Sequence, residues 1–191
     1  MAMLYPLQFL ASNALETVQG LKFGNSMPIL QYLDPFRCYL PLALITENRE
    51  RLCHFLAQLA HESGGFYYSE EIASGQAYEG RQDLGNVELG DGQRYKGRGL
   101  IQLTGRYNYR VYGKRLGIDL EGNPELAKTP DIAVRVAVLY WSLNKLNGLA
   151  DAGDFHAITR KINGGLNGLN NRWTWLNRFM TAYDRYAKTS R

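Results

Sequence analysis

Cysteine and histidine are scarce in this chain of 191 residues, which has two cysteines and three histidines. Cys38 and Cys53 do not form a CxxC pair, and so few histidines give little support for a Cys/His zinc site. Both cysteines lie in apolar stretches, so we expect buried free thiols made in a reducing compartment. The sequence therefore predicts neither a bound metal nor a cofactor.

Long apolar runs and long charged runs are also missing. No apolar stretch approaches the length that crosses a bilayer, and the first residues, MAMLYP, lack the basic segment and cleavage site of a signal peptide. No run of five Lys or Arg occurs, so an arm that binds nucleic acid is not indicated. The net charge of +4 and a pI near 9.0 favour polyanions or an anionic surface. We expect a soluble, cytoplasmic, monomeric protein that does not bind nucleic acid.

What the chain does contain is enough apolar side chain for one sizeable core. Its hydrophobic fraction is 45%, so we predict a single domain over residues 1–191, with short helices in residues 1–50 and the core in residues 51–191. Thirteen tyrosines and three tryptophans suit a sugar-binding cleft, where such rings stack on pyranose faces, but ordinary core packing would use them equally well.

Helical periodicity is clear in several segments and absent from one. Apolar spacing predicts helices over residues 47–61, 106–116, 132–146, 154–162 and 171–188, with Asp131 as an N-cap. Residues 66–99 are glycine-rich and irregular, as functional segments often are. Within and after them we predict a small β-ribbon at residues 66–72 and an extended piece at residues 100–104. The predicted fold class is mainly α, a helical bundle with a small β-ribbon and loop region.

Glu62 is the first candidate for acid–base chemistry. It ends an apolar helix directly before Ser63-Gly64-Gly65. A helix C-terminus and apolar neighbours both disfavour the ionised form of a carboxyl group. A carboxylic acid that stays protonated can protonate the leaving oxygen of a glycoside. An alternative is a surface glutamate at a frayed helix end.

A glycosidase needs a second carboxylate, which activates water or attacks the sugar. The candidates beyond Glu62 are Glu70, Glu71, Glu79, Asp83, Glu88 and Asp91. In a short strand Glu70 and Glu71 would point to opposite faces, so only one of them can face a cleft, and we choose Glu71. The others would then be solvated loop residues.

The segment Lys96–Tyr109 offers polar side chains between glycines. If residues 100–104 are extended, Gln102 and Thr104 share one face while Ile101 and Leu103 pack inward. An amide beside a hydroxyl can hold a water molecule or a sugar N-acetyl group, and the flanking glycines allow close approach of a ligand.

Three segments, taken together and in this order, resemble the signatures of glycoside hydrolase family 19, which includes plant and bacterial chitinases and many phage endolysins. They are Phe55–Gly65, Gly97–Tyr109 and Ile162–Gly165. The resemblance implies a lysozyme-like α+β fold with an active-site cleft, and metal-free hydrolysis by a single displacement with inversion. It places Glu62 on the general acid, and Gln102 and Thr104 on residues that bind substrate and position water. Further substrate-binding positions fall on His61, Tyr107, Asn108, Asn163 and, more loosely, Arg172.

The position of the general base separates two branches of this family. The plant enzymes carry it over twenty residues after the acid, where this chain offers Leu84 instead of a carboxylate. In the endolysin branch a carboxylate nine positions after the acid is the usual candidate, and Glu71 occupies that position. The resemblance therefore implies an endolysin that cuts the β-1,4 bonds between N-acetylmuramic acid and N-acetylglucosamine in bacterial peptidoglycan. Glu71 is the expected base, with Glu79, Glu88 and Asp91 as alternatives.

Other interpretations remain open. The chain could be a chitinase that acts on a neutral polymer, or an inactive module that only binds the wall. Its basic C-terminal helix could also contact the anionic envelope or a membrane, through Arg172, Arg178, Arg185, Lys188 and Arg191. For an endolysin we expect no separate wall-binding domain, storage in the host cytoplasm until holin-type release, and action in the periplasm and cell wall.

Overall fold

The computed structural model describes residues 8–11, 15–22 and 24–189, and most of them lie in helices. The α-helices are α2 (Leu33–Tyr39), α3 (Arg49–Glu62), α4 (Asp91–Arg94), α5 (Arg106–Leu116), α6 (Pro130–Leu143), α7 (Leu146–Asp151), α8 (Phe155–Asn163) and α9 (Leu169–Thr189). Short 3-10 turns are η1 (Phe9–Ala11), η2 (Leu15–Thr17), η3 (Pro28–Tyr32), η4 (Pro41–Ala43), η5 (Gln76–Tyr78), η6 (Gln82–Leu84) and η7 (Pro124–Lys128). The predicted mainly helical fold class is confirmed.

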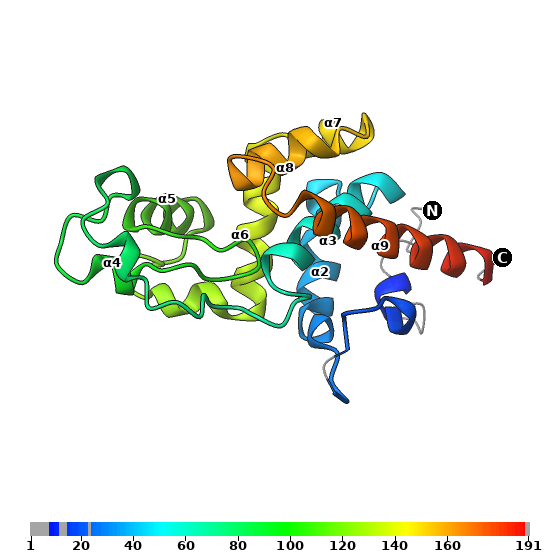
Figure 1. Ribbon diagram of the computed structural model, residues 1–191, viewed down its shortest axis with the longest axis horizontal. Coiled ribbons are helices and arrows are strands. Elements are labelled where there is room, and N and C mark those ends of the chain that lie inside the picture. The colour runs from blue at the N-terminus through cyan, green and yellow to red at the C-terminus, as the bar shows by residue number, and fades with distance from the viewer. Residues whose placement is uncertain (1–7, 12–14, 23, 190–191) are drawn as a thin grey trace.

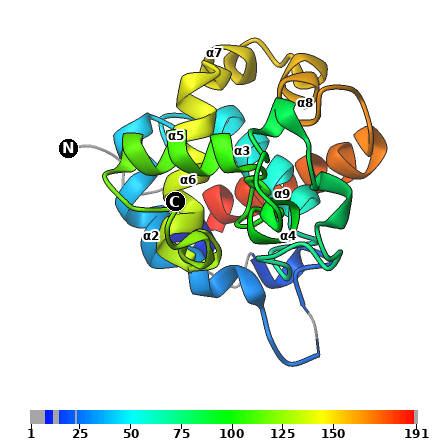
Figure 2. The same ribbon diagram turned by 90° about the vertical axis from the view of Figure 1, so that its left-hand side faces the viewer.

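The molecule is elongated and has two parts of different character (Figure 1). The helical part, residues 28–66 and 130–189, contains α2, α3 and α6 to α9. The loop part, residues 70–128, contains α4 and α5 and projects to the left in Figure 1, away from α9. Seen from that side, α5 and α4 lie in front of α3 and α9 (Figure 2).

Helices α3 and α9 pack side by side and form the centre of the helical part. Helix α3 begins at Asn48, whose side chain accepts a hydrogen bond from the Arg51 amide at 2.8 Å. On α9, Trp175, Leu176 and Phe179 are buried at the expected spacing. Full burial of such a side chain contributes about 1.5–3 kcal/mol, so this apolar contact fixes the helix that ends at Glu62.

The helix predicted over residues 132–146 divides in the structure. Helix α6 ends at Leu143, and α7 starts again at Leu146, because Lys145 adopts the left-handed conformation with φ of 54°. The N-cap of α6 is Thr129 and not Asp131, so that prediction was wrong. The Asp131 carboxylate instead accepts a hydrogen bond from the Tyr39 hydroxyl at 2.9 Å.

The β-ribbon predicted at residues 66–72 is also wrong. Among the residues that the structure describes, the only β-pairs are isolated bridges, Glu70 with Arg98 and Arg98 with Leu103. Gly64, Gly65 and Phe66 have φ values of 57°, 73° and 69°, which turn the chain instead of extending it. Phe66 adopts this strained conformation while its side chain is completely buried.

Two predictions about side-chain exposure need correction. Cys53 is buried as expected, and burial raises the pKa of its thiol to about 12, but Cys38 is exposed. On α9, Arg172 is fully buried and cannot belong to an outward basic face, while Arg191 lies outside the described residues. No helix in the described ranges is long and apolar enough to cross a membrane.

Candidate active site

Glu62 lies where α3 ends. The Ser63 hydroxyl donates to the Leu59 carbonyl at 2.6 Å and accepts from the Phe66 amide at 2.9 Å, which closes the helix and starts the turn. The Glu62 side chain keeps 18% of its surface exposed. The packed helix α3 therefore holds the Glu62 carboxyl group at a fixed position at the protein surface.

Arg172, on α9, contacts the Glu62 carboxylate from the protein interior. The arginine side chain has no exposed surface, and its Nη2 lies 2.5 Å from Glu62 Oε1. Its Nη1 donates to Gln58 Oε1 at 2.5 Å, and its Nε donates to the Asn167 carbonyl at 3.2 Å. The fork of the guanidinium thus fixes two side chains one turn apart on α3. The sequence predicts only a helix end and apolar groups around Glu62, and the structure adds a cation.

The same network reaches α8, because Gln58 Nε2 donates to Thr159 Oγ1 at 3.1 Å. Both side chains are completely buried. A buried polar network of this kind is stable only when its members are paired, and it then selects one arrangement of the helices. Helices α3, α8 and α9 are consequently locked together directly beneath Glu62.

His61 is held by the segment that joins α8 to α9. Its Nδ1 lies 2.8 Å from Asn171 Oδ1, at the first turn of α9. Gly168 presses against the imidazole ring, because a Cβ there would lie 2.2 Å from His61 Cε1. Only glycine fits this contact, and its φ of 71° also favours glycine.

Glu71 belongs to the loop part and has different neighbours. Its Oε1 accepts a hydrogen bond from the Tyr78 hydroxyl at 3.0 Å, and its Oε2 accepts one from the Gly97 amide at 3.2 Å. Burial, and then this hydrogen bond to the carboxylate, raises the pKa of Tyr78 above its ordinary value. Tyr78 therefore remains a hydrogen-bond donor to Glu71 across the neutral range.

Glu70 and Glu71 contact different groups. Glu70 Oε1 lies 3.1 Å from the Nε of Arg98 and 3.4 Å from Lys96 Nζ, so it is occupied by cations. The Arg98 side chain is only 4% exposed. Glu70 is thus engaged by cations, which leaves Glu71 as the stronger candidate for the base.

Gly97 marks the place where Glu71, Gln102 and Thr104 converge. A Cβ at Gly97 would lie 2.7 Å from Gln102 Oε1, 3.2 Å from Glu71 Oε2 and 3.3 Å from Thr104 Oγ1. A carboxylate, an amide and a hydroxyl therefore face the same small volume. This set of acceptors and donors can bind a water molecule.

The extended conformation predicted for residues 100–104 is wrong, although Gln102 and Thr104 do share a face. Gln102 has a φ of 53°, and its Nε2 donates to the Gly99 carbonyl at 3.0 Å, so the segment is a turn. The Thr104 hydroxyl donates to the Gln102 carbonyl at 2.9 Å. A non-glycine residue in the left-handed region is strained, and such strain is common where a side chain is aimed at a ligand.

The other predicted sugar-binding residues come from α5 and α8. Tyr107 is 58% exposed and packs against Gly85, where a Cβ would lie 2.8 Å from Tyr107 Cβ. The Asn108 side chain donates to the Thr104 carbonyl at 2.7 Å. Asn163 is exposed at the last residue of α8, before Gly164 with a φ of 75°.

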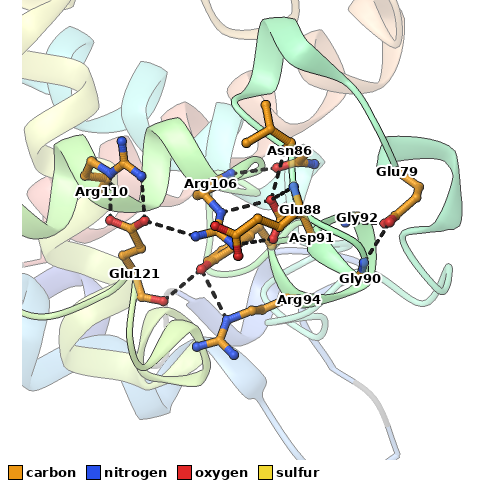
Figure 3. Close-up of polar contacts among 12 residues, drawn as sticks. Glu79, Asn86, Glu88, Gly90, Asp91, Gly92, Arg94, Arg106, Arg110 and Glu121 are labelled. Carbon is orange, nitrogen blue, oxygen red and sulfur yellow. Dashed lines mark hydrogen bonds and ion pairs between the residues drawn. The ribbon is translucent and has the colours of Figure 1, made fainter.

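The carboxylates considered as alternative bases are occupied by other contacts (Figure 3). Glu79 accepts from the amides of Gly90 and Gly92 at 2.7 and 2.8 Å. Asp91 is buried, which opposes its ionisation, but hydrogen bonds from Arg106 at 2.6 Å and from backbone amides prevail and lower its pKa. Glu88 lies 2.6 Å from the same guanidinium.

A pocket of about 780 Å³ lies beside this network, and its lining includes Asp91, Tyr95, Arg106 and Glu121. Neither Glu62 nor Glu71 lines it. The pocket is therefore separate from the candidate acid and base. Among the described residues, no group of three or more His, Cys, Asp or Glu side chains is arranged to hold a metal ion.

Three residues that hold side chains of the candidate site were missed in the sequence. Gln58 and Asn171 contact Arg172 and His61, and Tyr78 contacts Glu71. Gln58 lies one helical turn before Glu62, so a buried polar residue at that spacing was a usable signal. Tyr78 lies in an irregular segment, where spacing carries no such information.

Comparison with known proteins gives a consistent set of relatives. The sequence model of the family described as chitinase class I matches residues 43–151. A Haemophilus influenzae protein described as containing a glycosyl hydrolase family 19 domain is 35% identical over 156 residues, which cover 65% of this chain and 76% of the relative. An endochitinase of Arabidopsis thaliana is 41% identical over 121 residues, and these cover 63% of this chain but 41% of the plant protein.

Solved structures agree on the fold. Chitinase C from Streptomyces griseus has a TM-score of 0.68 at 23% identity, covering 94% of this chain and 91% of the other. A family 19, class IV chitinase from Zea mays has a TM-score of 0.58 at 25% identity, covering 97% and 91%.

Proposed function

Because the chain belongs to glycoside hydrolase family 19, the family of the class I chitinases, we propose that it hydrolyses the β-1,4 bonds between N-acetylmuramic acid and N-acetylglucosamine in bacterial peptidoglycan. One observation carries the proposed chemistry. Glu62 is held by a buried guanidinium, whereas Glu71 lies with an amide and a hydroxyl around Gly97. Two carboxyl groups in such different surroundings can take different roles.

In the proposed reaction Glu62 protonates the oxygen of the leaving sugar. Glu71 accepts a proton from a water molecule that Gln102 and Thr104 hold, and this water attacks the anomeric carbon from the opposite face. The bond to the leaving oxygen breaks as the bond to water forms, so the configuration inverts. Tyr78 and the Gly97 amide orient the Glu71 carboxylate towards that water.

Arg172 takes a positioning role in this proposal. With no exposed surface it cannot touch a bound polymer in this conformation, unlike the substrate-binding role that the sequence comparison suggested. It orients Glu62 through a direct contact and is itself held by Gln58 and Asn167. Tyr107, Asn108, Asn163 and His61 are the proposed sugar-binding residues.

Two features support peptidoglycan as the substrate. Glu71 follows Glu62 by nine residues, which resembles the endolysin branch, and the net charge of +4 suits a wall that is rich in carboxylates and phosphates. Chitin is the second candidate, and identities of 41% and 39% to plant endochitinases favour it. The chain spans about two fifths of the length of those relatives.

Digestion of the two polymers separates these candidates. Purified peptidoglycan and colloidal chitin are incubated with the protein, and the soluble fragments are reduced with borohydride and identified by mass spectrometry. Reduced muramic acid ends would support the proposed bond, and reduced glucosamine ends from peptidoglycan would move the cut to the alternate bond. Soluble fragments from chitin alone would favour a chitinase. If neither polymer yields soluble fragments, the proposed hydrolysis is wrong.

The Glu62→Gln variant tests the acid. We expect its hydrolysis to fall by a factor of about 10²–10⁴, because the amide cannot supply the proton. The glutamine oxygen can still accept a hydrogen bond from Arg172, so the variant should fold at the assay temperature, which a melting curve verifies. Activity within a few-fold of wild type would remove Glu62 from the reaction.

The Glu71→Gln variant tests the base, and Glu70→Gln is its matched control. These two glutamates are neighbours in the sequence but contact different groups. We expect at least about a hundredfold loss for Glu71→Gln and a small change for Glu70→Gln, measured as turbidity loss of purified walls. A larger loss of activity in Glu70→Gln than in Glu71→Gln would make Glu70 the base and contradict the proposal.

A further inference from the structure

The turn that follows Glu62 presents two aromatic rings to solvent. Tyr67 and Tyr68 are 51% and 42% exposed, although Phe66 immediately before them is completely buried. The two exposed rings meet edge to face, with centroids 4.9 Å apart and an interplanar angle of 85°. Exposed aromatic rings offer flat, partly apolar surface that a ligand can cover.

The backbone of the turn fixes where these rings lie. Phe66, in the left-handed conformation, contacts the core rings Tyr32, Phe36 and Phe179 and so anchors the turn from below. The Tyr68 amide then donates to the Ser63 carbonyl at 2.9 Å, which brings the chain back towards the end of α3. A strained residue held by core packing therefore points the next two side chains outward.

Gly64 makes room for the Tyr68 ring. A Cβ on Gly64 would lie 2.8 Å from Tyr68 Cδ2 and 3.1 Å from Tyr68 Cε2, so the ring rests directly on this glycine. Gly64 is two residues after Glu62, and its Cα can be at most about 7.6 Å from the Cα of Glu62. That distance is comparable to one or two sugar units of a glycan chain.

We propose that Tyr68, braced edge-on by Tyr67, is a stacking platform for an N-acetylated pyranose of the glycan, next to the sugar whose bond is cut. This inference rests on the proposed glycan hydrolysis and adds a binding residue to it. The flat ring offers its face to the C–H groups of a pyranose, and its hydroxyl can contact the polar rim of the sugar. Because the platform binds a sugar beside the reacting bond, it acts on substrate affinity and not on the chemical step.

Steady-state kinetics on a soluble N-acetylated oligosaccharide made from the preferred polymer test this platform. Tyr68→Ala and Tyr68→Leu remove the flat ring, and Leu keeps bulk against Gly64. We expect KM to rise about tenfold in both, with kcat within about twofold of wild type, and Tyr68→Phe to retain most of the affinity. Leu89→Ala is the control, because it trims a side chain that is 99% exposed in the loop part.

The outcomes separate the platform from the proposed function. If wild-type protein cleaves the oligosaccharide but Tyr68→Ala and Tyr68→Leu keep the wild-type KM, the platform is wrong and the hydrolase stands. A fall in kcat without a change in KM would also overturn it. If wild-type protein cleaves no glycan, titration of the oligosaccharide followed by NMR still tests the platform, since loss of binding only in Tyr68→Ala and Tyr68→Leu would support it.

Discussion

The helical part and the loop part of this molecule are stabilised in different ways. In the helical part, α3 and α9 bury large apolar side chains, and apart from the site at Arg172 its ion pairs, such as Arg51 with Asp151, are partly exposed. In the loop part the apolar cluster is smaller and rich in tyrosine, and the arginines Arg98 and Arg106 each hold two or more carboxylates. Apolar packing is non-directional, whereas each guanidinium bond has a defined geometry.

This difference coincides with the division of the candidate site. Glu62 comes from the part held by apolar packing, where helix α3 fixes its position. Glu71 comes from the part held by polar contacts, where Tyr78 and the Gly97 amide fix its direction. A reaction that needs one acid and one base in different surroundings is thus built from two kinds of scaffold.

The largest expected effect comes from Arg172, the one buried charged side chain among the described residues of the helical part. Replacing it by methionine removes a partner from Glu62 and Gln58 inside a packed interface. We expect the free energy of unfolding to fall by about 3–5 kcal/mol, as measured by urea denaturation, because an unpaired carboxylate is left behind. Activity should fall with it, because Glu62 loses its orientation.

Pairing this change with Glu62→Gln sharpens the interpretation. With the carboxylate removed as well, no charge is left unpaired, and the double variant should recover part of the lost stability. Arg172→Lys tests geometry separately, since a lysine keeps the charge but not the fork that reaches two side chains. Strictly additive losses in the double variant would show that the two residues do not act as a pair.

His54 gives the next effect, and it depends on pH. Burial in the helical part lowers the pKa of this histidine to about 4, and its Nδ1 has no hydrogen-bond partner within the described part of the chain. Below pH 6.5 the unfolded chain binds a proton that the folded chain does not. Stability is therefore complete above about pH 6.5 and falls by about 3 kcal/mol as the pH approaches 4.

His54→Leu should remove this pH dependence between pH 6.5 and 4, as measured by urea denaturation at several pH values. The loop part also has carboxylates whose pKa values are lowered, Asp91, Glu121 and Glu125. Their stabilising contribution is lost as the pH falls below their ordinary values of 3.8 and 4.5, and this loss remains in both proteins. An unchanged slope in the variant would mean that another group in the helical part carries the effect.

The same contrast explains what the sequence could predict. Helical periodicity found the helical part well, including α3 and α9, because apolar packing leaves a repeating pattern. Helical periodicity located Glu62 at a helix end. The order of the three family motifs located the segments around Gln102 and Asn163. Periodicity missed the break at Lys145, because a left-handed lysine carries no signal in composition.

Predictions failed most in the loop part. Its conformation depends on left-handed residues such as Gln102 and on carboxylates that cap amides at a distance, as Glu79 does for Gly90. These contacts join residues that no local pattern relates. The burial of Arg172 was missed for the same reason, because its partners Gln58 and Glu62 are more than one hundred residues away.

The smallest expected effect comes from Arg106, and it decides whether the loop part responds as a separate unit. Arg106→Ala removes the cation from buried Asp91, which still accepts from the amides of Val87 and Glu88. We expect a loss of about 2 kcal/mol, because part of the carboxylate's compensation remains. The matched control is Arg110→Ala, whose exposed pair with Glu121 should change the stability little, because solvent screens it. Hydrogen exchange followed by mass spectrometry should show faster exchange confined to the loop part. Equally faster hydrogen exchange in α3 and α9 would mean that the two parts unfold together. The parts would then differ in the contacts that hold them but not in how they unfold.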